Sequence, residues 1–171
     1  NTLVLRRALE YAATFDLTVF LTPLDPCLGH GLAHEGQVAS RMGLAGIPAA
    51  AETGAIARDL ELIRDLGVRA HFGRLSCARS VELIARAQSE RLPVTADVAI
   101  HQLYLTEMDL AGFDSQCHVQ PPLRGLRDLG RERQLKQPLQ ARAGLHVGEV
   151  LVWENSPDAV RLGAKSLEVE G

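Results

Sequence analysis

Four polar side chains stand next to apolar segments of this chain, at places where a ligand could bind. They differ in chemistry: one is a carboxylate, one a guanidinium, one an imidazole and one an amide. Together, such groups can hold a small polar molecule through charge and hydrogen bonds. We take the four as substrate-pocket candidates and assign no residue a catalytic role: they are Asp25, Arg74, His101 and Gln120.

The histidines offer one pattern that resembles a metal site. His30 and His34 are four residues apart and precede Glu35, a spacing that places two imidazoles on one face of a helix. Glycines at positions 29, 31 and 36 would break such a helix, so the pattern favours a loop over a zinc site. His71 lies beside Phe72 in an apolar run, and we expect a core histidine that hydrogen bonds to the backbone.

Three cysteines, Cys27, Cys77 and Cys117, are far apart and form no C-x-x-C pair. Neither a zinc knuckle nor a disulfide framework is indicated, and a reducing cytoplasm fits best. Cys27 and Cys77 both lie near predicted strand ends. A nucleophilic pair with a histidine would need a third, orienting group, and none is apparent, so we expect buried and inert thiols.

The elements that position these residues alternate between helices and strands. Apolar periodicity predicts helices over 2–15, 51–66 and 78–91, with Gly67 ending the second, and buried strands over 17–21, 68–73 and 94–100. A glycine-rich loop over 26–48 contains at most a short helix at 37–42. This succession is typical of βαβ units, in which strands are parallel and ligands bind at their carboxyl ends.

The last part of the chain has a weaker pattern. Residues 126–141 could form a polar helix interrupted at Pro138, and 147–153 could form one more strand. We therefore divide the chain into a first part, 1–125, and a divergent tail of unassigned structure, 126–171.

Composition excludes several classes of partner. The 171 residues carry 18 basic and 21 acidic side chains, and only 4% are aromatic. A nucleic-acid surface would need a basic excess or stacking aromatics, so nucleic acid is not expected. No run approaches the roughly 20 apolar residues that span a bilayer, so we expect a soluble, cytoplasmic protein without a membrane partner.

Several segments together resemble a known family. They are GLAHEGQVAS (31–40), GLAGIP (43–48), AET with IARDLEL (51–62), RAHFGRLS (69–76), LPVTADV (92–98) and HVQPPLR (118–124). In order and spacing they are similar to the middle of a dihydroorotase of the amidohydrolase superfamily. The resemblance implies an α/β fold, a partial (β/α)8 TIM barrel of the metal-dependent hydrolase type, of which the chain supplies only the central βα units, because a whole barrel needs about 250 residues.

Active members of that family interconvert carbamoyl-aspartate and dihydroorotate with zinc held by histidines and aspartates. One family histidine opens an H-x-E-D motif, where this chain has Thr22 followed by Pro23, Leu24 and Asp25. Another ends an H-x-x-H pattern that begins here at His71, and its place is taken by Arg74. Arginine has no lone pair to give a metal and carries a permanent charge, so we expect no metal and no cofactor.

Two further departures follow from the same comparison. The family's NPPLR motif begins here with Gln120, one methylene longer than asparagine at a position that contacts substrate. If Arg74 occupies the vacated metal position, we expect Asp25 or another carboxylate to pair with it.

The resemblance implies three functions, which stay open at this point. The first is a noncatalytic dihydroorotase-like protein of pyrimidine biosynthesis that supports the assembly of aspartate carbamoyltransferase; segment 5–19 points to that branch. The second is part of an active zinc-dependent dihydroorotase whose other ligands lie elsewhere. The third is a small α/β binding domain that uses the strand ends for another ligand. Exposed strand edges also favour self-association.

Overall fold

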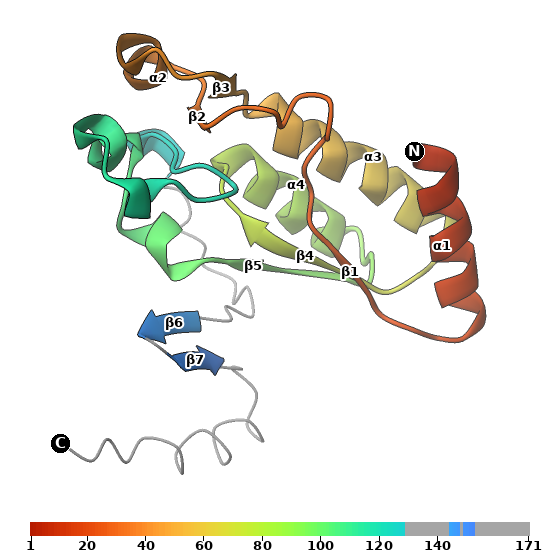
Figure 1. Cartoon of the computed structure of the whole chain (residues 1–171). Coiled ribbons are helices and arrows are strands. Elements are labelled where there is room, and N and C mark those ends of the chain that lie inside the picture. The colour runs from red at the N-terminus through yellow and green to blue at the C-terminus, as the bar shows by residue number, and fades with distance from the viewer. Residues whose placement is uncertain (129–143, 148, 153–171) are drawn as a thin grey trace, which may run out of the picture.

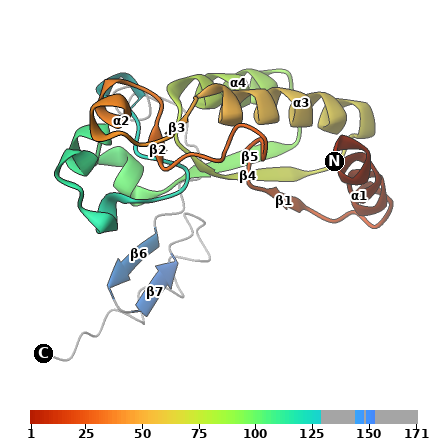
Figure 2. The same cartoon turned by 45° about the horizontal axis from the view of Figure 1, so that its top comes forward.

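The structure is a computed structural model that describes residues 1–128, 144–147 and 149–152. Its centre is a parallel sheet in the order β1 (Val19–Leu21), β4 (Ala70–Leu75) and β5 (Val94–Val98). Helix α3 (Ala50–Leu66) precedes β4, and α4 (Ala78–Ser89) connects β4 to β5. Both helices cover the same face of the sheet (Figures 1 and 2). The predicted βαβ arrangement is confirmed.

The first helix, α1 (Thr2–Thr14), lies at the end of α3 and packs against it. Helix α3 ends at Gly67, whose φ of 66° is a left-handed conformation that glycine adopts without strain. The sequence predicts the first helix and the end of α3 at Gly67. Predicted strand 94–100 ends instead at Val98, because a 3₁₀ helix, η1 (Ile100–Leu103), follows directly.

The glycine-rich loop is more ordered than its composition suggests. The expected short helix is present as α2 (Gln37–Met42), and it lies between two strands of two residues each, β2 (Ala33–His34) and β3 (Gly46–Ile47), which pair in parallel. A Cβ at Gly46 would lie 2.8 Å from the Cα of Glu35, so only glycine allows this approach. Two-residue strands have no periodicity, which is why the sequence does not predict them.

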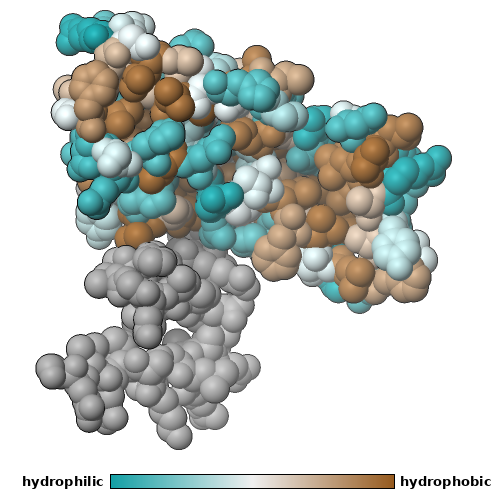
Figure 3. Space-filling view, viewed as in Figure 1, coloured by the Kyte–Doolittle hydropathy of each residue, from teal (hydrophilic) through white to brown (hydrophobic). Residues whose placement is uncertain are grey.

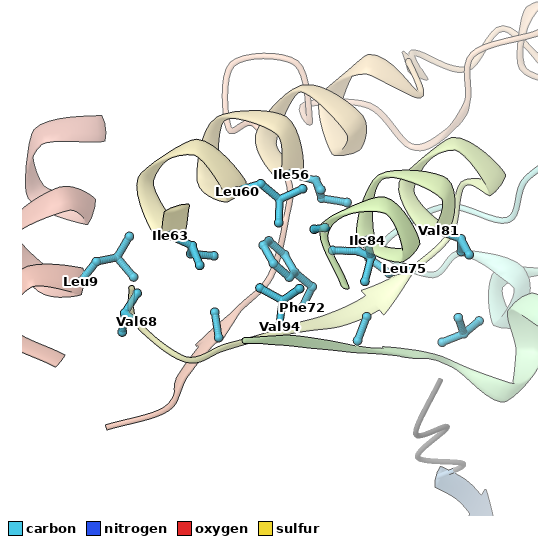
Figure 4. Packing of buried hydrophobic residues seen from close by; sticks show 14 of the residues in the cluster. Leu9, Ile56, Leu60, Ile63, Val68, Phe72, Leu75, Val81, Ile84 and Val94 are labelled. Atoms are coloured by element: carbon cyan, nitrogen blue, oxygen red, sulfur yellow. The ribbon is translucent and has the colours of Figure 1, made fainter. Parts of the chain in front are cut away.

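The hydrophobic core lies between the sheet and its helices (Figure 4). Phe72 of β4 is fully buried against Ile56 and Ile63 of α3 and Ile84 of α4, and Leu9 of α1 closes one end. Strand residues alternate between two faces. Because Ala70 and Phe72 join this core, the intervening positions of β4 and β5 face away from the helices. In a closed barrel that second face is the interior.

One burial prediction is wrong. Segment 17–21 was expected to form a strand buried on both faces, yet the side chain of Phe20 is 64% exposed and that of Leu17 51%. The physical reason is that β1 is an edge strand, and no described residue pairs with its outer side. Brown apolar surface lies at the end of the molecule that holds α1 and β1 (Figure 3).

Two more 3₁₀ helices, η2 (Glu107–Gly112) and η3 (Ser115–Cys117), precede the segment 118–124. In the tail, β6 (Gly144–Val147) and β7 (Glu149–Val152) form an antiparallel pair, and β7 falls within the predicted strand 147–153. Most of the predicted helix 126–141 lies outside the described residues. The division of the chain at residue 125 stays a prediction. No described helix has both the length and the apolar character to cross a lipid bilayer.

Candidate functional site

A small cavity lies at the carboxyl ends of β1 and β4. Its volume is about 110 Å³, and three of its six lining residues follow β1, one ends β4 and two belong to the segment before Arg124. The lining residues are Thr22, Pro23, Leu24, Arg74, Gln120 and Pro121. The structure therefore brings together two of the four predicted pocket residues, Arg74 and Gln120, beside Thr22.

Arg74 sits in a bulge of β4. The pairing of β4 with β5 shifts register between Phe72 and Leu75, and Arg74 has a φ of 58°, an uncommon conformation for a non-glycine residue. Its backbone N–H donates to the Oδ1 of Asp97. Its Nη1 donates to the carbonyl of Gln120 at 3.4 Å, which places the guanidinium at the cavity wall. The bulge thus aims a fixed positive charge at the cavity.

Asp97 also holds a histidine. The Nε2 of His71 lies 3.0 Å from the Oδ2 of Asp97, and its Nδ1 lies 2.8 Å from the hydroxyl of Thr95. Because a carboxylate only accepts, Nε2 carries the hydrogen, and in the neutral ring Nδ1 accepts from Thr95. His71 is 7% exposed. The predicted core histidine is confirmed, but its partners are side chains and not the backbone.

Asp25 has a local role. Its Oδ1 accepts from the backbone N–H groups of Cys27 at 2.8 Å and Leu28 at 3.3 Å, which shapes the turn after β1. Within residues 1–128 no carboxylate forms an ion pair with Arg74, so the expected pairing of Asp25 with Arg74 is wrong. The carboxylate of Asp25 stays in the turn because two backbone N–H groups there donate hydrogen bonds to it.

His101 lies near Arg74 without lining the cavity. Burial lowers the pKa of His101, and the positive charge of Arg74 lowers it further. Its Nε2 is buried and has no hydrogen-bond partner among the described residues. Of the four predicted pocket residues, Arg74 and Gln120 line the cavity, His101 lies close enough to Arg74 to feel its charge, and Asp25 shapes a turn.

A buried polar network that the sequence reasoning missed lies behind this site. Arg124 donates from Nε to the hydroxyl of Ser76 at 3.0 Å and from Nη1 to the carbonyl of Ile47 at 3.0 Å. Glu52 accepts from the hydroxyl of Ser76 and, at 3.0 Å, from its backbone N–H. His34 Nδ1 lies 3.0 Å from Nη1 of Arg124. The network ties the glycine-rich loop, α3, the end of β4 and the segment before residue 125 into one unit.

Each member of this network belongs to one of the segments that carry the family resemblance. His34 is in GLAHE, Glu52 in AET, Ser76 in RLS and Arg124 in PPLR. Each of these four motifs contributes one hydrogen-bonding side chain to the network, and the presence of the motifs together is the signal that could have identified these residues. His34 therefore has a structural partner, and burial followed by the charge of Arg124 lowers its pKa.

The cysteines behave differently from one another. Cys77 is buried, and burial followed by the nearby Glu52 carboxylate raises its pKa to about 12, as expected for an inert thiol. Cys27 is exposed, which corrects the expectation that both thiols are buried. The turn 25–28 projects it outward because Asp25 folds the backbone back on itself.

The residues at this site do not fit zinc. Within the described ranges no group of three histidine, cysteine or carboxylate side chains is arranged to hold a metal. At the two positions that the family resemblance assigns to ligands stand a neutral hydroxyl, Thr22, and a guanidinium, Arg74, both on the cavity wall. A cation placed there would meet the positive charge of Arg74 and no strong donor.

Comparison with known proteins gives a consistent relationship. No protein-family model matches the chain. It is 54% identical over 159 residues to a dihydroorotase-like protein of Pseudomonas aeruginosa, which covers 91% of this chain and 38% of that protein. It is 57% identical over 129 residues to a dihydroorotase-like protein of Pseudomonas putida and 45% identical over 130 residues to a dihydroorotase of Syntrophobacter fumaroxidans, each covering 75% of this chain and 30% of the relative.

Solved structures agree on the fold. L-hydantoinase from Arthrobacter aurescens superposes with a TM-score of 0.63 at 24% identity, over 75% of this chain and 29% of that one. A dihydroorotase from Campylobacter jejuni superposes with a TM-score of 0.54 at 9% identity, over 93% and 44%. The predicted partial (β/α)8 barrel is confirmed, and the chain spans less than two fifths of the length of the curated relatives named above.

Proposed function

The chain belongs to the dihydroorotase family, and from this premise we propose that it is part of a noncatalytic dihydroorotase-like protein of pyrimidine biosynthesis. One observation carries the proposal. Arg74, in the place of a family metal ligand, directs a guanidinium to the cavity wall, and within residues 1–128 its guanidinium donates a single hydrogen bond, to the carbonyl of Gln120. Guanidinium cannot ligate zinc at any accessible pH.

The backbone around Arg74 supports the same interpretation. A left-handed φ at a non-glycine residue costs about 1 kcal/mol or more, and the Asp97 carboxylate stabilises it by accepting the Arg74 N–H. Asp97 is thereby engaged by Arg74 and His71, and the arginine that it holds in place contributes no lone pair to a metal.

We further propose that the partner is the catalytic chain of aspartate carbamoyltransferase. Segment 5–19, which resembles the noncatalytic branch, contains most of α1, and this helix exposes several large apolar side chains. They are Leu3, Val4, Tyr11 and Phe15. Apolar side chains gathered on one exposed helix are typical of a protein interface. The exposed edge strand β1 next to them makes self-association a second use of the same surface.

The alternative is part of an active zinc-dependent dihydroorotase. The 45% identity to the dihydroorotase of Syntrophobacter fumaroxidans favours it, because the similarity extends to catalytic relatives. The two proposals differ in one measurable property, which is whether zinc and turnover accompany the protein.

Zinc content and hydrolysis decide between them. The full-length protein of which this chain is part is purified, exposed to zinc, exchanged into metal-free buffer and measured by elemental analysis, alongside an assay of dihydroorotate hydrolysis. The Syntrophobacter fumaroxidans dihydroorotase serves as the positive control. We expect no retained zinc and no turnover. Stoichiometric zinc with activity would refute the noncatalytic proposal and establish the alternative.

The partner is tested separately by sedimentation velocity of the full chain with and without the catalytic chain of aspartate carbamoyltransferase. We expect the mixture to contain a species larger than any that either protein forms alone, and we expect less of that species with Tyr11→Ser. The matched control is Met108→Ser, which removes a side chain of similar exposure, 61% against 64%, from η2 and not from α1. An unchanged sedimentation profile on mixing would contradict the proposed partner.

A further inference from the structure

The cavity at Arg74 has walls of two kinds. Arg74, Thr22 and Gln120 supply polar groups, and Pro23, Leu24 and Pro121 supply apolar surface. The polar groups include one permanent cation, one hydroxyl and one amide, all of which can donate hydrogen bonds. A ligand that satisfies both walls carries a negative charge at one end and a short apolar stem at the other.

Most N–H donors of the Arg74 guanidinium have no hydrogen-bond partner among the described residues. Arginine carries five N–H donors in a planar fork. Among the described residues this side chain donates one hydrogen bond, from Nη1 to the carbonyl of Gln120, and it is long at 3.4 Å. No carboxylate within residues 1–128 forms an ion pair with it. A planar fork with free donors matches the two oxygens of a carboxylate.

The nearest fixed acid does not occupy these donors. Asp97 accepts from the backbone N–H of Arg74 through Oδ1 and from His71 through Oδ2. Its two oxygens are therefore engaged on the backbone side of Arg74, and they hold the bulge in place while the guanidinium reaches toward Gln120. Asp97 acts as a positioning residue for the cation.

The size of the cavity limits the ligand. Its volume of about 110 Å³ is several times the roughly 30 Å³ that one water occupies in the liquid, which leaves room for an anion of a few heavy atoms. A nucleotide or a peptide would not fit inside it.

We propose that this cavity binds a short aliphatic carboxylate, with Arg74 holding the carboxylate group, Thr22 and Gln120 donating to it and the prolines contacting its stem. In this arrangement the guanidinium replaces the positive charge that a metal supplies in catalytic relatives, so the pocket binds an anion without performing hydrolysis. The proposal does not rest on the assembly role, because it concerns a free small molecule and this chain alone.

His101 provides a spectroscopic readout. The positive charge of Arg74 is one of the causes that lower the pKa of His101. A carboxylate bound to Arg74 would offset that charge, so the pKa of His101 measured by NMR should rise on binding. A merely structural arginine would give no such coupling.

The test titrates the purified full chain with acetate and with propionate at constant ionic strength set by chloride, followed by NMR of the histidine ring signals. We expect saturable binding that is tighter for propionate, whose extra methylene contacts the apolar wall. Arg74→Gln should weaken binding about tenfold or more, because a charge-assisted pair is lost. The affinity of Arg74→Lys for carboxylate should lie between those of the unchanged chain and Arg74→Gln, since lysine keeps the charge but not the planar fork of donors.

Arg91→Gln is the matched control. Arg91 is an exposed arginine with a φ of 62°, close to that of Arg74, so the same substitution removes the same charge from the same backbone conformation. It should leave carboxylate binding unchanged. Inorganic phosphate is titrated in parallel.

Three outcomes would overturn the proposal. The first is no saturable shift with either carboxylate, and the second is equal weakening in the Arg74→Gln and Arg91→Gln chains. The third is binding of phosphate in preference to both carboxylates, which would assign the cavity to a different class of anion. Because no zinc, dihydroorotate or aspartate carbamoyltransferase enters this experiment, its failure is separate from failure of the proposed function.

Discussion

Arg124 and Glu52 form an ion pair inside the protein, with Nη2 of Arg124 3.7 Å from Oε2 of Glu52 and the two side chains only 2% and 1% exposed. The pair joins the segment before residue 125 to the first turn of α3 across the end of β4. Nη2 has no hydrogen bond among the described residues. Breaking a buried pair leaves one charge uncompensated, which costs far more than losing a surface pair.

Arg124→Met should therefore lower the free energy of unfolding by about 3–5 kcal/mol. Methionine replaces the methylenes of Arg124, but the buried Glu52 carboxylate loses its cationic partner. Urea denaturation followed by circular dichroism measures the change. Arg79→Met is the control, because Arg79 pairs with Glu82 at the surface and its loss should cost under about 1 kcal/mol. Similar losses in the two variants would show that the buried pair has no special role.

Stability should fall in mild acid through His34. Burial and the charge of Arg124 hold the pKa of His34 below its ordinary value of 6.5 in the folded protein. Below pH 6.5 the unfolded chain binds the proton more readily than the folded one, so the stabilisation present above that pH is lost as the pH falls toward the folded pKa. Thermal unfolding midpoints between pH 7.5 and 5, sampled in steps of about half a unit, measure this slope.

His34→Gln should reduce that slope, since glutamine can accept from Arg124 without titrating. His118→Gln is the control, because His118 is exposed and its side chain forms no hydrogen bond within residues 1–128. Some slope should persist, since burial also lowers the pKa of His101. If the pH dependence of the unfolding midpoint is unchanged in His34→Gln, protonation of His34 does not cause the loss of stability in acid.

Thiol reactivity should separate the cysteines. Cys27 is exposed and Cys77 is buried with a pKa of about 12, so thiolate at neutral pH is scarce at Cys77. Iodoacetamide treatment of the folded chain, followed by peptide mass spectrometry, should label Cys27 first and Cys77 only after denaturant is added. Equal labelling of both in the native protein would contradict the buried site.

Alanine substitutions at Gly54, inside α3, and at Gly67, which follows α3, should change the free energy of unfolding in opposite directions. Gly67→Ala should lower the free energy of unfolding by about 1 kcal/mol, because its φ of 66° strains any residue with a Cβ. Gly54→Ala should raise it by about 0.5–1 kcal/mol, since Gly54 lies inside the helix and a Cβ there meets no atom within 4 Å. Urea denaturation of both variants checks the pair, and a gain at Gly67 would refute the left-handed cap.

The helices and the three strands of the central sheet within the first 100 residues could be predicted from local patterns. Helix periodicity, the glycine after Leu66 and short apolar runs act over a few residues, so the sequence specifies them without knowledge of the rest of the chain. The exposure of β1 could not be predicted in this way. Whether an apolar strand is covered depends on which neighbours pair with it, and Phe20 is exposed because β1 lies at the edge of the sheet.

Some features of the candidate site also follow from the sequence alone, and others depend on the tertiary structure. The sequence alone, through its family resemblance, assigned Arg74 to the position of a metal ligand, because residue type at a motif position is a local property. Only the tertiary structure decided that Gln120 meets Arg74 and that Glu52 and Arg124 pair in the interior. These two contacts join residues that are 46 and 72 positions apart in the sequence. Such contacts depend on how the strands and helices pack, which no short pattern encodes.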